Sequence, residues 1–349
     1  MKKSLLALAV LGAFAGAASA QSSVTLYGRV DLSVGKGAGL ASKHLQNGSG
    51  SRLGMRGVED LGGGTSAFFN IEHRFNADTG AVTDASGRFW AGRSIVGLQG
   101  GFGRVTLGRE YTTAFLGSQL VADPWGWDTV VSGTPGTGLN QAITGGAIAA
   151  VRNDSSLTYN FAASGFSFAA QIAEATDALN NFPNRPVNFA VGYAAGPLRL
   201  GMGYERTGAE AAANAKWTTF NGSYNLGAVT LGAFFGTGNT AANAKHKSWM
   251  FTAVAPMGQG ELRASYGKLT RDVAGPAAKY DAHKGLGVGY HYALSKRTTV
   301  YADFVRNTGE YKRAAQELAV GGSATAIANA AALDSSAKTG YNFGIKHNF

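Results

Sequence analysis

Apolar residues recur at every second position in short segments along nearly the whole chain after residue 20. Residues 198–204 read Leu-Arg-Leu-Gly-Met-Gly-Tyr, and the final segment, Tyr341–Phe349, keeps the same alternation. Successive side chains of a β-strand point to opposite faces, so each segment predicts a strand with one apolar face and one polar or glycine-rich face. A chain built from such segments is predicted to be all-β.

About sixteen of these segments follow one another without a linker. They begin near Val24, Ser51, Thr65, Arg88, Gly103, Asn153, Gly165, Val187, Pro197, Trp217, Ala228, Lys247, Gly260, Lys284, Arg297 and Gly340. Very short turns alternate with longer polar connections, of which the longest are 111–152 and 308–339. Short turns at one end and long loops at the other are typical of bacterial outer-membrane β-barrels.

The strand length also fits a membrane-spanning barrel. Strands of about ten residues at a steep tilt cross the hydrocarbon layer, and the barrel must close because lipid offers no partner to an exposed strand edge. A soluble β-sandwich is the alternative, since its strands also alternate where one face packs in the core. Here the polar face is rich in Gly, Asn, Ser, Thr and Arg, with no second apolar layer. This composition favours the antiparallel transmembrane barrel.

Composition excludes several other classes. The 349 residues include no Cys, which removes disulfide scaffolds, Cys-ligated zinc and thiol nucleophiles. A hydrophobic content of 45% is too high for a disordered chain. No long apolar run follows residue 20, so no membrane-spanning helix is predicted. The net charge of +10 raises the possibility of nucleic-acid binding, but the basic residues are dispersed along the chain and an export signal precedes them.

That export signal is residues 1–20. Lys2-Lys3 forms a positive region, residues 5–18 form an apolar stretch, and Ala18-Ser19-Ala20 is a small-residue cleavage site. We predict that this signal peptide is cleaved and that residues 21–349 form a single outer-membrane barrel domain. The lack of Cys suits passage through an oxidising periplasm.

Several motifs carry a resemblance to a known family. They are Val24–Asp31 (Val-Thr-Leu-Tyr-Gly-Arg-Val-Asp), Ser51–Gly64 (Ser-Arg-Leu-Gly-Met-Arg-Gly-Val-Glu-Asp-Leu-Gly-Gly-Gly), Val96–Gly103 with Gly108-Arg109, and the terminal Phe349. The chain resembles the Gram-negative general porins of the Neisseria and Burkholderia type. The resemblance covers the mature chain, and its first hundred or so residues are the specific part.

This resemblance implies a barrel of sixteen strands with short periplasmic turns and long extracellular loops. It also implies a homotrimer in the outer membrane, among lipid and lipopolysaccharide, and a third loop folded inward to narrow a water-filled pore. Small hydrophilic solutes and inorganic ions would diffuse through it passively. Phe349 resembles the terminal aromatic residue that the barrel-assembly machinery reads.

Porins select solutes by pore width and by the charges that line the pore. Strand parity places five arginines on the inner face, opposite apolar residues such as Leu53, Phe69 and Val96. They are Arg56, Arg93, Arg152, Arg52 and Arg74. The resemblance implies that the first three are the main basic residues of the pore constriction and that Arg52 and Arg74 come second. Guanidinium groups are always ionised, so a cluster of them is predicted to concentrate anions. An arginine near a strand end can instead contact lipid headgroups or lipopolysaccharide phosphate. Arg88 and Arg109 are candidates for that role.

The predicted third loop runs from Tyr111 to roughly Val151 and contains few acidic residues. They are Asp123 and Asp128, with Glu110 at the base of the loop. The loop departs from the Pro-Glu-Phe-Gly-Gly type of motif found in the family, with Ala-Asp-Pro-Trp-Gly-Trp-Asp at 122–128 instead. Because inward arginines outnumber the loop acids, we predict mild anion selectivity.

Other functions have less support in the sequence. There is no Gly-x-Ser-x-Gly elbow or Ser-His-acid arrangement, no His pair with zinc spacing and no sign of a cofactor, so an enzyme is not predicted. The alternative that stays open is a substrate-specific channel, or an adhesin-like barrel whose long loops bind a ligand or host partner. In a sugar channel Trp125 and Trp127 would begin an aromatic slide, although we expect them instead to pack the third loop against the wall.

Overall fold

The computed structural model describes residues 23–84, 87–133, 138–174, 185–207, 215–240, 243–273, 279–319 and 330–349. The expected signal peptide, residues 1–20, lies outside this range.

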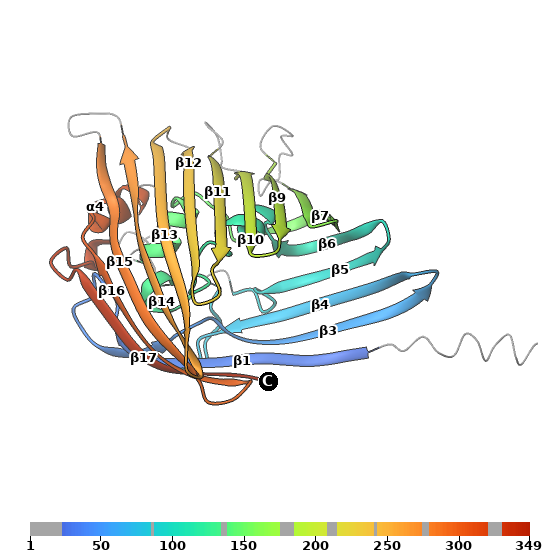
Figure 1. Ribbon diagram of the computed structural model, residues 1–349, viewed down its shortest axis with the longest axis horizontal. Helices are drawn as coiled ribbons and strands as arrows, with labels where there is room; N and C mark the ends of the chain where they lie inside the picture. The colour runs from blue at the N-terminus through green and yellow to red at the C-terminus, as the bar shows by residue number, and fades with distance from the viewer. Residues whose placement is uncertain are drawn as a thin grey trace, which may run out of the picture.

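The described chain forms one antiparallel β-barrel (Figure 1). The strands are β1 (Ser23–Lys36), β2 (His44–Asn47), β3 (Ser51–Gly62), β4 (Thr65–Phe75), β5 (Arg93–Gly100), β6 (Gly103–Tyr111), β7 (Arg152–Ala163), β8 (Phe166–Ala173), β9 (Val187–Ala195), β10 (Leu198–Arg206), β11 (Lys216–Asn225), β12 (Thr230–Asn239), β13 (Lys245–Met257), β14 (Gly260–Asp272), β15 (Lys279–Ala293), β16 (Thr298–Asn307) and β17 (Thr339–Asn348). The helices are η1 (Phe115–Gln119), α2 (Thr129–Ser132), α3 (Leu139–Gly145) and α4 (Tyr311–Ala319). The short β2 and the longer β3 both pair with β1, so together they fill one position and the barrel has sixteen.

The barrel closes between the first and the last strand. Strand β1 pairs with β17 from Arg29 opposite Asn348 to Lys36 opposite Tyr341, and with β3 on its other side. Every other strand pairs with its neighbours in sequence. The sixteen-stranded antiparallel barrel predicted from the alternation is therefore confirmed.

The connections also follow the prediction, with short turns at one end and longer loops at the other.

Two predicted strand starts were wrong. Strand β5 begins at Arg93 rather than Arg88, because Phe89 leaves the strand pattern and stacks on His73 with ring centroids 4.1 Å apart. Strand β15 begins at Lys279 rather than Lys284, because the register with β14 skips Ala282, and this irregularity leaves Ala282 and His283 both buried and breaks the alternation.

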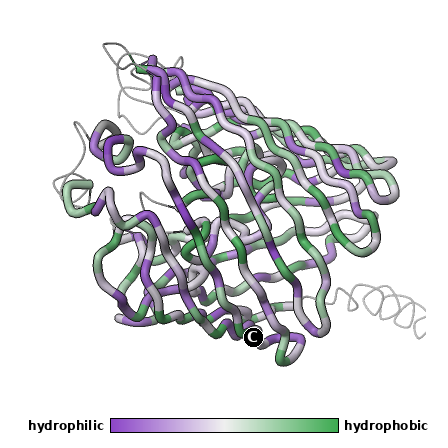
Figure 2. The backbone as a smooth tube through the Cα atoms, turned by 60° about the vertical axis from the view of Figure 1, so that its left-hand side comes forward, coloured by the Kyte–Doolittle hydropathy of each residue, from purple (hydrophilic) through white to green (hydrophobic). Residues whose placement is uncertain are grey.

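The two faces of the barrel wall differ as the alternation predicts. Val96 is 56% exposed on the outer face, whereas inward neighbours such as Ile95 are buried. Figure 2 shows hydrophobic and hydrophilic residues alternating along the strands. A continuous apolar outer surface suits contact with lipid chains.

The third loop folds inside the barrel and forms its core. It contains η1, α2 and α3, which contact the inner faces of β9–β17 (Figure 1). Val131, Leu139 and Ile143 of this loop are fully buried with Trp217 and Met250 of the wall. The predicted inward-folded third loop is confirmed.

Helix α4 belongs to the last long loop. The Tyr311 hydroxyl donates a hydrogen bond to the Asp334 carbonyl at 2.8 Å, and Arg271 Nη1 of β14 donates to the Ala314 carbonyl at 3.0 Å. These bonds hold the loop against the wall. Within the described part of the chain, no helix combines the length and the apolar character needed to cross a membrane.

Candidate functional site

A row of arginines crosses the wall of the barrel where the third loop begins. Arg29 on β1 lies opposite Arg52 on β3, and Arg52 lies opposite Arg74 on β4. Like charges directly opposite on neighbouring strands repel one another. Such a row is tolerated where water and nearby acceptors can solvate it, as in a polar lumen.

Tyr111, the last residue of β6, brings further arginines to this row. Its hydroxyl accepts hydrogen bonds from Arg74 Nη2 and from Arg152 Nη2, each at 2.5 Å. The guanidinium carbons of Arg152 and Arg93 lie 4.1 Å and 4.9 Å from the centre of its ring, within cation–π range. The tyrosine therefore holds three of the sequence-predicted arginines around one side chain.

From the sequence, Tyr111 is recognisable only as the start of the third loop, and its contacts with the arginines are not predicted. No local pattern distinguishes it from other strand-end tyrosines, since its partners come from β4, β5 and β7.

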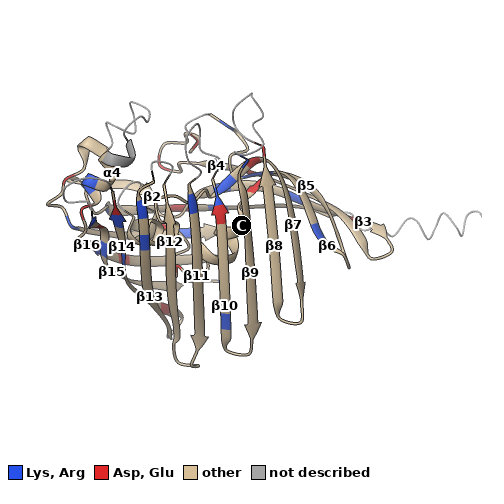
Figure 3. Cartoon of the chain, turned by 90° about the horizontal axis from the view of Figure 1, so that it is seen from above, with Lys and Arg blue, Asp and Glu red and all other residues tan. Residues whose placement is uncertain are grey.

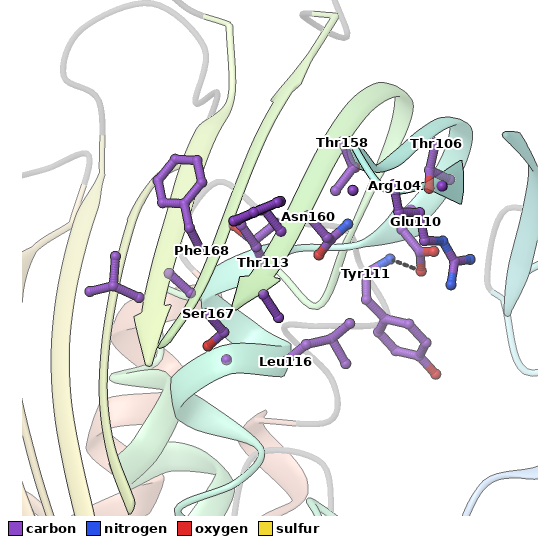
Figure 4. Close-up of a pocket in the computed structure, with 18 of the residues that line it drawn as sticks. Arg104, Thr106, Glu110, Tyr111, Thr113, Leu116, Thr158, Asn160, Ser167 and Phe168 are labelled. Carbon is purple, nitrogen blue, oxygen red and sulfur yellow. Dashed lines mark hydrogen bonds between the residues drawn. The ribbon is translucent and has the colours of Figure 1, made fainter. Parts of the chain in front are cut away.

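Two glutamates of the wall pair with part of this cluster. Glu110 accepts a hydrogen bond from Arg93 Nε at 2.7 Å. It also accepts one from the Tyr111 backbone N–H at 2.7 Å (Figure 4). Glu72 accepts from Arg74 Nε at 2.7 Å. Glu110, predicted at the base of the loop, lies at the end of β6 and neutralises a wall arginine.

Other arginines of the cluster have no such partner. Among the described residues, Arg52, Arg56 and Arg152 form no ion pair within 4.0 Å. The wall formed by β1 and β3–β7 therefore carries an excess of positive charge, and Figure 3 shows basic positions on β5 and β6.

Arg56 lies apart from the other predicted arginines. It is four positions farther along β3 than Arg52, toward the short-turn end, and lies opposite Asn70. It lines a cavity of about 260 Å³ together with Arg93 and Arg104. Arg104 is not among the arginines predicted to line the pore, although its parity with Glu110 on β6 places it inward.

Asp128 of the third loop faces the arginine row. Its Oδ2 lies 3.5 Å from Arg29 Nη1. Desolvation inside the barrel raises the pKa of Asp128 to about 6, against the lowering effect of Arg29 and Arg52. The following residue, Thr129, donates its backbone N–H to the Gly48 carbonyl at 2.7 Å, which ties the loop to the start of β3.

Asp123 is placed differently, inside the loop itself. It is buried and accepts hydrogen bonds from the backbone N–H of Trp125 at 3.1 Å, from that of Trp127 at 2.8 Å, and from Asn140 Nδ2 at 2.8 Å. Burial raises the pKa of Asp123. The structure thus places one predicted loop acid toward the arginines and the other in a bend of the loop.

Side-chain bonds fasten the loop to the opposite wall. Trp125 Nε1 donates to Asp303 Oδ1 at 2.7 Å, and Trp217 Nε1 donates to the Thr144 carbonyl at 2.9 Å. Glu205 accepts the Ala150 backbone N–H at 2.8 Å. Trp125 is 3% exposed, so it packs the loop and does not line a path through the barrel.

The two arginines considered for lipopolysaccharide contact join an ion-pair cluster. Arg88 lies 2.9 Å from Asp84 and 3.1 Å from Asp154, and Arg109 also pairs with Asp154. Strict alternation along residues 152–154 would put Asp154 on the same face as Arg152. A register shift between β6 and β7 next to Ser155, whose φ is 46°, breaks that parity.

Phe349 lies at the closure of the barrel. Its backbone N–H donates to the Gly28 carbonyl at 3.1 Å, and the Gly28 N–H donates to the Phe349 carbonyl at 3.0 Å. A Cβ atom at Gly28 would overlap the Phe349 ring. The glycine in the Tyr-Gly-Arg motif therefore makes room for the terminal aromatic ring.

Comparisons with known proteins agree with this architecture. A family model described as Gram-negative porin matches residues 7–312. Outer membrane porin protein 32 of Delftia acidovorans is 34% identical over all of both chains. Major outer membrane protein P.IB of Neisseria meningitidis serogroup B is 38% identical over 31% of this chain and 34% of its own.

Among solved structures, an anion-selective porin from Comamonas acidovorans aligns with a TM-score of 0.70 and 26% identity, covering 94% of this chain and 100% of its own. The family and these relatives are porins, which form channels and reside in the outer membrane. The chain belongs to the Gram-negative porin family and is an outer-membrane diffusion channel.

Proposed function

We propose that this porin is a mildly anion-selective general channel for small hydrophilic solutes and ions, and that the arginines around Tyr111 set its selectivity. The observation that carries the proposal is the convergence of Arg74, Arg93 and Arg152 on one tyrosine, beside Arg52. Glu72, Glu110 and Asp128 offset only part of this charge.

The physical basis is the potential of a narrow aqueous path between low-dielectric walls. Fixed charges of one sign there raise the local concentration of the opposite ion and lower that of the like ion. The third loop fills the side against β9–β17, so a passing ion is kept near the arginine wall. The similar porin from Comamonas acidovorans is anion-selective, which supports the same sign of selectivity for this chain.

Assembly is part of the proposal. We infer a homotrimer, as in the trimer form described for OmpT of Vibrio cholerae, surrounded by lipid and lipopolysaccharide. The predicted signal peptide of residues 1–20 directs export, and Phe349 serves as the assembly signal for the barrel-assembly machinery. The chain acts as a passive channel, with no enzymatic role.

The test is recording of the purified protein in a planar bilayer under a KCl gradient. The reversal potential of the wild type is expected to have the sign that indicates a preference for chloride. The variants Arg93→Gln and Arg152→Gln should move the reversal potential toward zero, while Arg297→Gln in an exposed turn should not. A preference for potassium, or the same potential in all four proteins, would reject the arginine mechanism. Saturable block by a sugar would favour the substrate-specific alternative, and an absence of conductance would favour the adhesin.

A further inference from the structure

A second group of arginines lies on the periplasmic side of the Tyr111 cluster. It lines the cavity of about 260 Å³ beside β1 and β3–β6. The lining residues used below are Thr25, Arg56, Phe68, Asn70, Arg93, Gln99 and Arg104. No acidic residue belongs to the described lining of this cavity. Arg93 pairs with Glu110, which lies outside that lining, so Arg56 and Arg104 supply the uncompensated positive charge.

Aromatic rings, rather than carboxylates, hold two of these arginines. The guanidinium carbon of Arg104 lies 3.9 Å from the centre of the Phe68 ring, and that of Arg56 lies 5.4 Å from the centre of the Tyr27 ring. Within the described residues, neither forms an ion pair with an acidic side chain. A ring face positions a guanidinium without using its N–H groups, which remain able to donate to an anion.

Neutral side chains add further donors. Asn70 Oδ1 accepts the Tyr27 hydroxyl at 2.8 Å, so the Asn70 amide keeps its N–H groups for the cavity. Thr25 lies opposite Arg56, and Gln99 lies opposite Arg104 in the strand register. Two guanidinium groups with adjacent amide and hydroxyl donors form a polar surface suited to a compact oxyanion.

The cavity lies next to the constriction, on its periplasmic side. Arg93 lines it and also lines the larger cavity, of about 680 Å³, that Glu110, Tyr111 and Leu116 surround (Figure 4). Arg56 is four positions along β3 from Arg52, a distance of roughly 13 Å along the strand. Arg104 follows the periplasmic turn at Gly103. The two groups of arginines are therefore consecutive along the wall.

We propose that Arg56 and Arg104, with Asn70 and Gln99, form a second anion-binding site that takes a compact divalent oxyanion such as phosphate on the periplasmic side of the constriction. The inference rests on the proposed anion-selective channel and adds a bound stage to it. An oxyanion held there slows chloride passing along the same wall.

The test is inhibition of chloride current by inorganic phosphate, added to each side of a bilayer in turn, in dilute KCl to limit screening. We expect saturable inhibition of wild type, stronger from one side. Arg56→Gln and Arg104→Gln should each raise the half-inhibiting concentration by about fivefold, the upper range for a solvated ion pair. Arg199→Gln is the matched control, because Arg199 lines a different cavity beside β8–β13.

The reversal potential of the same channels separates this site from the constriction. Retained chloride preference with weakened phosphate inhibition in both variants supports a distinct site. Three outcomes overturn the proposed second site: no inhibition by phosphate, equal inhibition of all the proteins, or inhibition weakened as much by Arg199→Gln as by Arg56→Gln and Arg104→Gln. Lost chloride preference in wild type would instead reject the proposed selectivity, while the phosphate comparison would still decide whether the site exists. Normal heat-modifiable mobility on gels shows that the variants have folded.

Discussion

At the scale of single residues, the charged side chains act through their partners. Tyr111 gathers Arg74 and Arg152 by its hydroxyl and receives Arg93 against its ring. A tyrosine supplies both an acceptor and a π-face. Neighbouring guanidinium groups would otherwise spread apart by repulsion, so this residue shapes the charge distribution without carrying charge itself.

Substitution of Tyr111 should separate the two kinds of contact. Tyr111→Phe removes the hydroxyl acceptor and keeps the ring, and Tyr111→Leu removes both. Because each exposed cation–π contact contributes about 0.5–1 kcal/mol, chloride preference should fall in the order wild type, Tyr111→Phe, Tyr111→Leu. Reversal potentials under a KCl gradient measure this order. Identical potentials in the three proteins would show that the arginines keep their positions without the tyrosine.

Asp128 should make selectivity depend on pH. Its pKa is raised to about 6, so the carboxylate is ionised above that value and neutral below it. Acidification from about pH 7.5 to about pH 5 removes a negative charge opposite Arg29 and should increase chloride preference. The reversal potential should titrate with a midpoint near 6. Asp128→Asn should show the acidic value at both pH values, and a pH-dependent shift retained in that variant would assign the titration elsewhere.

At the scale of elements, the third loop is held by a few long-range bonds to the wall. Trp125 donates to Asp303 of β16, and Trp217 of β11 donates to the Thr144 carbonyl of α3. The strands keep their own ladder whether or not these bonds form. The loop can therefore loosen while the barrel stays closed.

Trp125→Phe should test that separation. The change keeps an aromatic ring but leaves the buried Asp303 without its indole donor, at a cost of about 1–3 kcal/mol. We expect noisier single-channel currents with an unchanged unfolding temperature of the barrel. Trp127→Phe is the control, since its indole donates to Thr144 within the loop. Current noise in Trp125→Phe equal to that of the wild type would mean that other contacts suffice to hold the third loop in place.

At the scale of the whole molecule, closure joins the two ends of the described chain. Strand β1 pairs with β17, and the Phe349 ring occupies the space above Gly28. A barrel has no stable open form in lipid, because an unpaired strand edge leaves its backbone groups without partners. The contact between β1 and β17 is therefore essential to the stability of the whole barrel.

Gly28→Val should impair closure. The added side chain overlaps the Phe349 ring, so the yield of folded barrel in refolding with detergent or lipid should fall severalfold. Heat-modifiable mobility on gels reports that yield. Gly101→Ala serves as the control, because no atom lies within 4 Å of its added Cβ. Equal yields would show that the terminal ring can move aside.

The sequence alone determined the architecture, because a lipid-facing barrel requires one apolar and one polar face on every strand. This requirement acts on each residue locally, and segments such as Leu198–Tyr204 show it directly. The inward parity of Arg56 and Arg93 follows from the same rule. The rule fails where a bulge shifts the register, as at Ala282 of β15 and at Ser155 of β7.

Only the tertiary structure decided how the inward side chains are combined. Tyr111 became the centre of the arginine cluster through partners on β4, β5 and β7, which are distant in sequence. Asp123 and Asp128 are both aspartates of the third loop, but their contacts differ. Asp123 is enclosed by a bend of the loop, whereas Asp128 faces Arg29. Periodicity specifies the face on which a residue lies, whereas its partners depend on strand register and loop packing, which are set by contacts between distant segments.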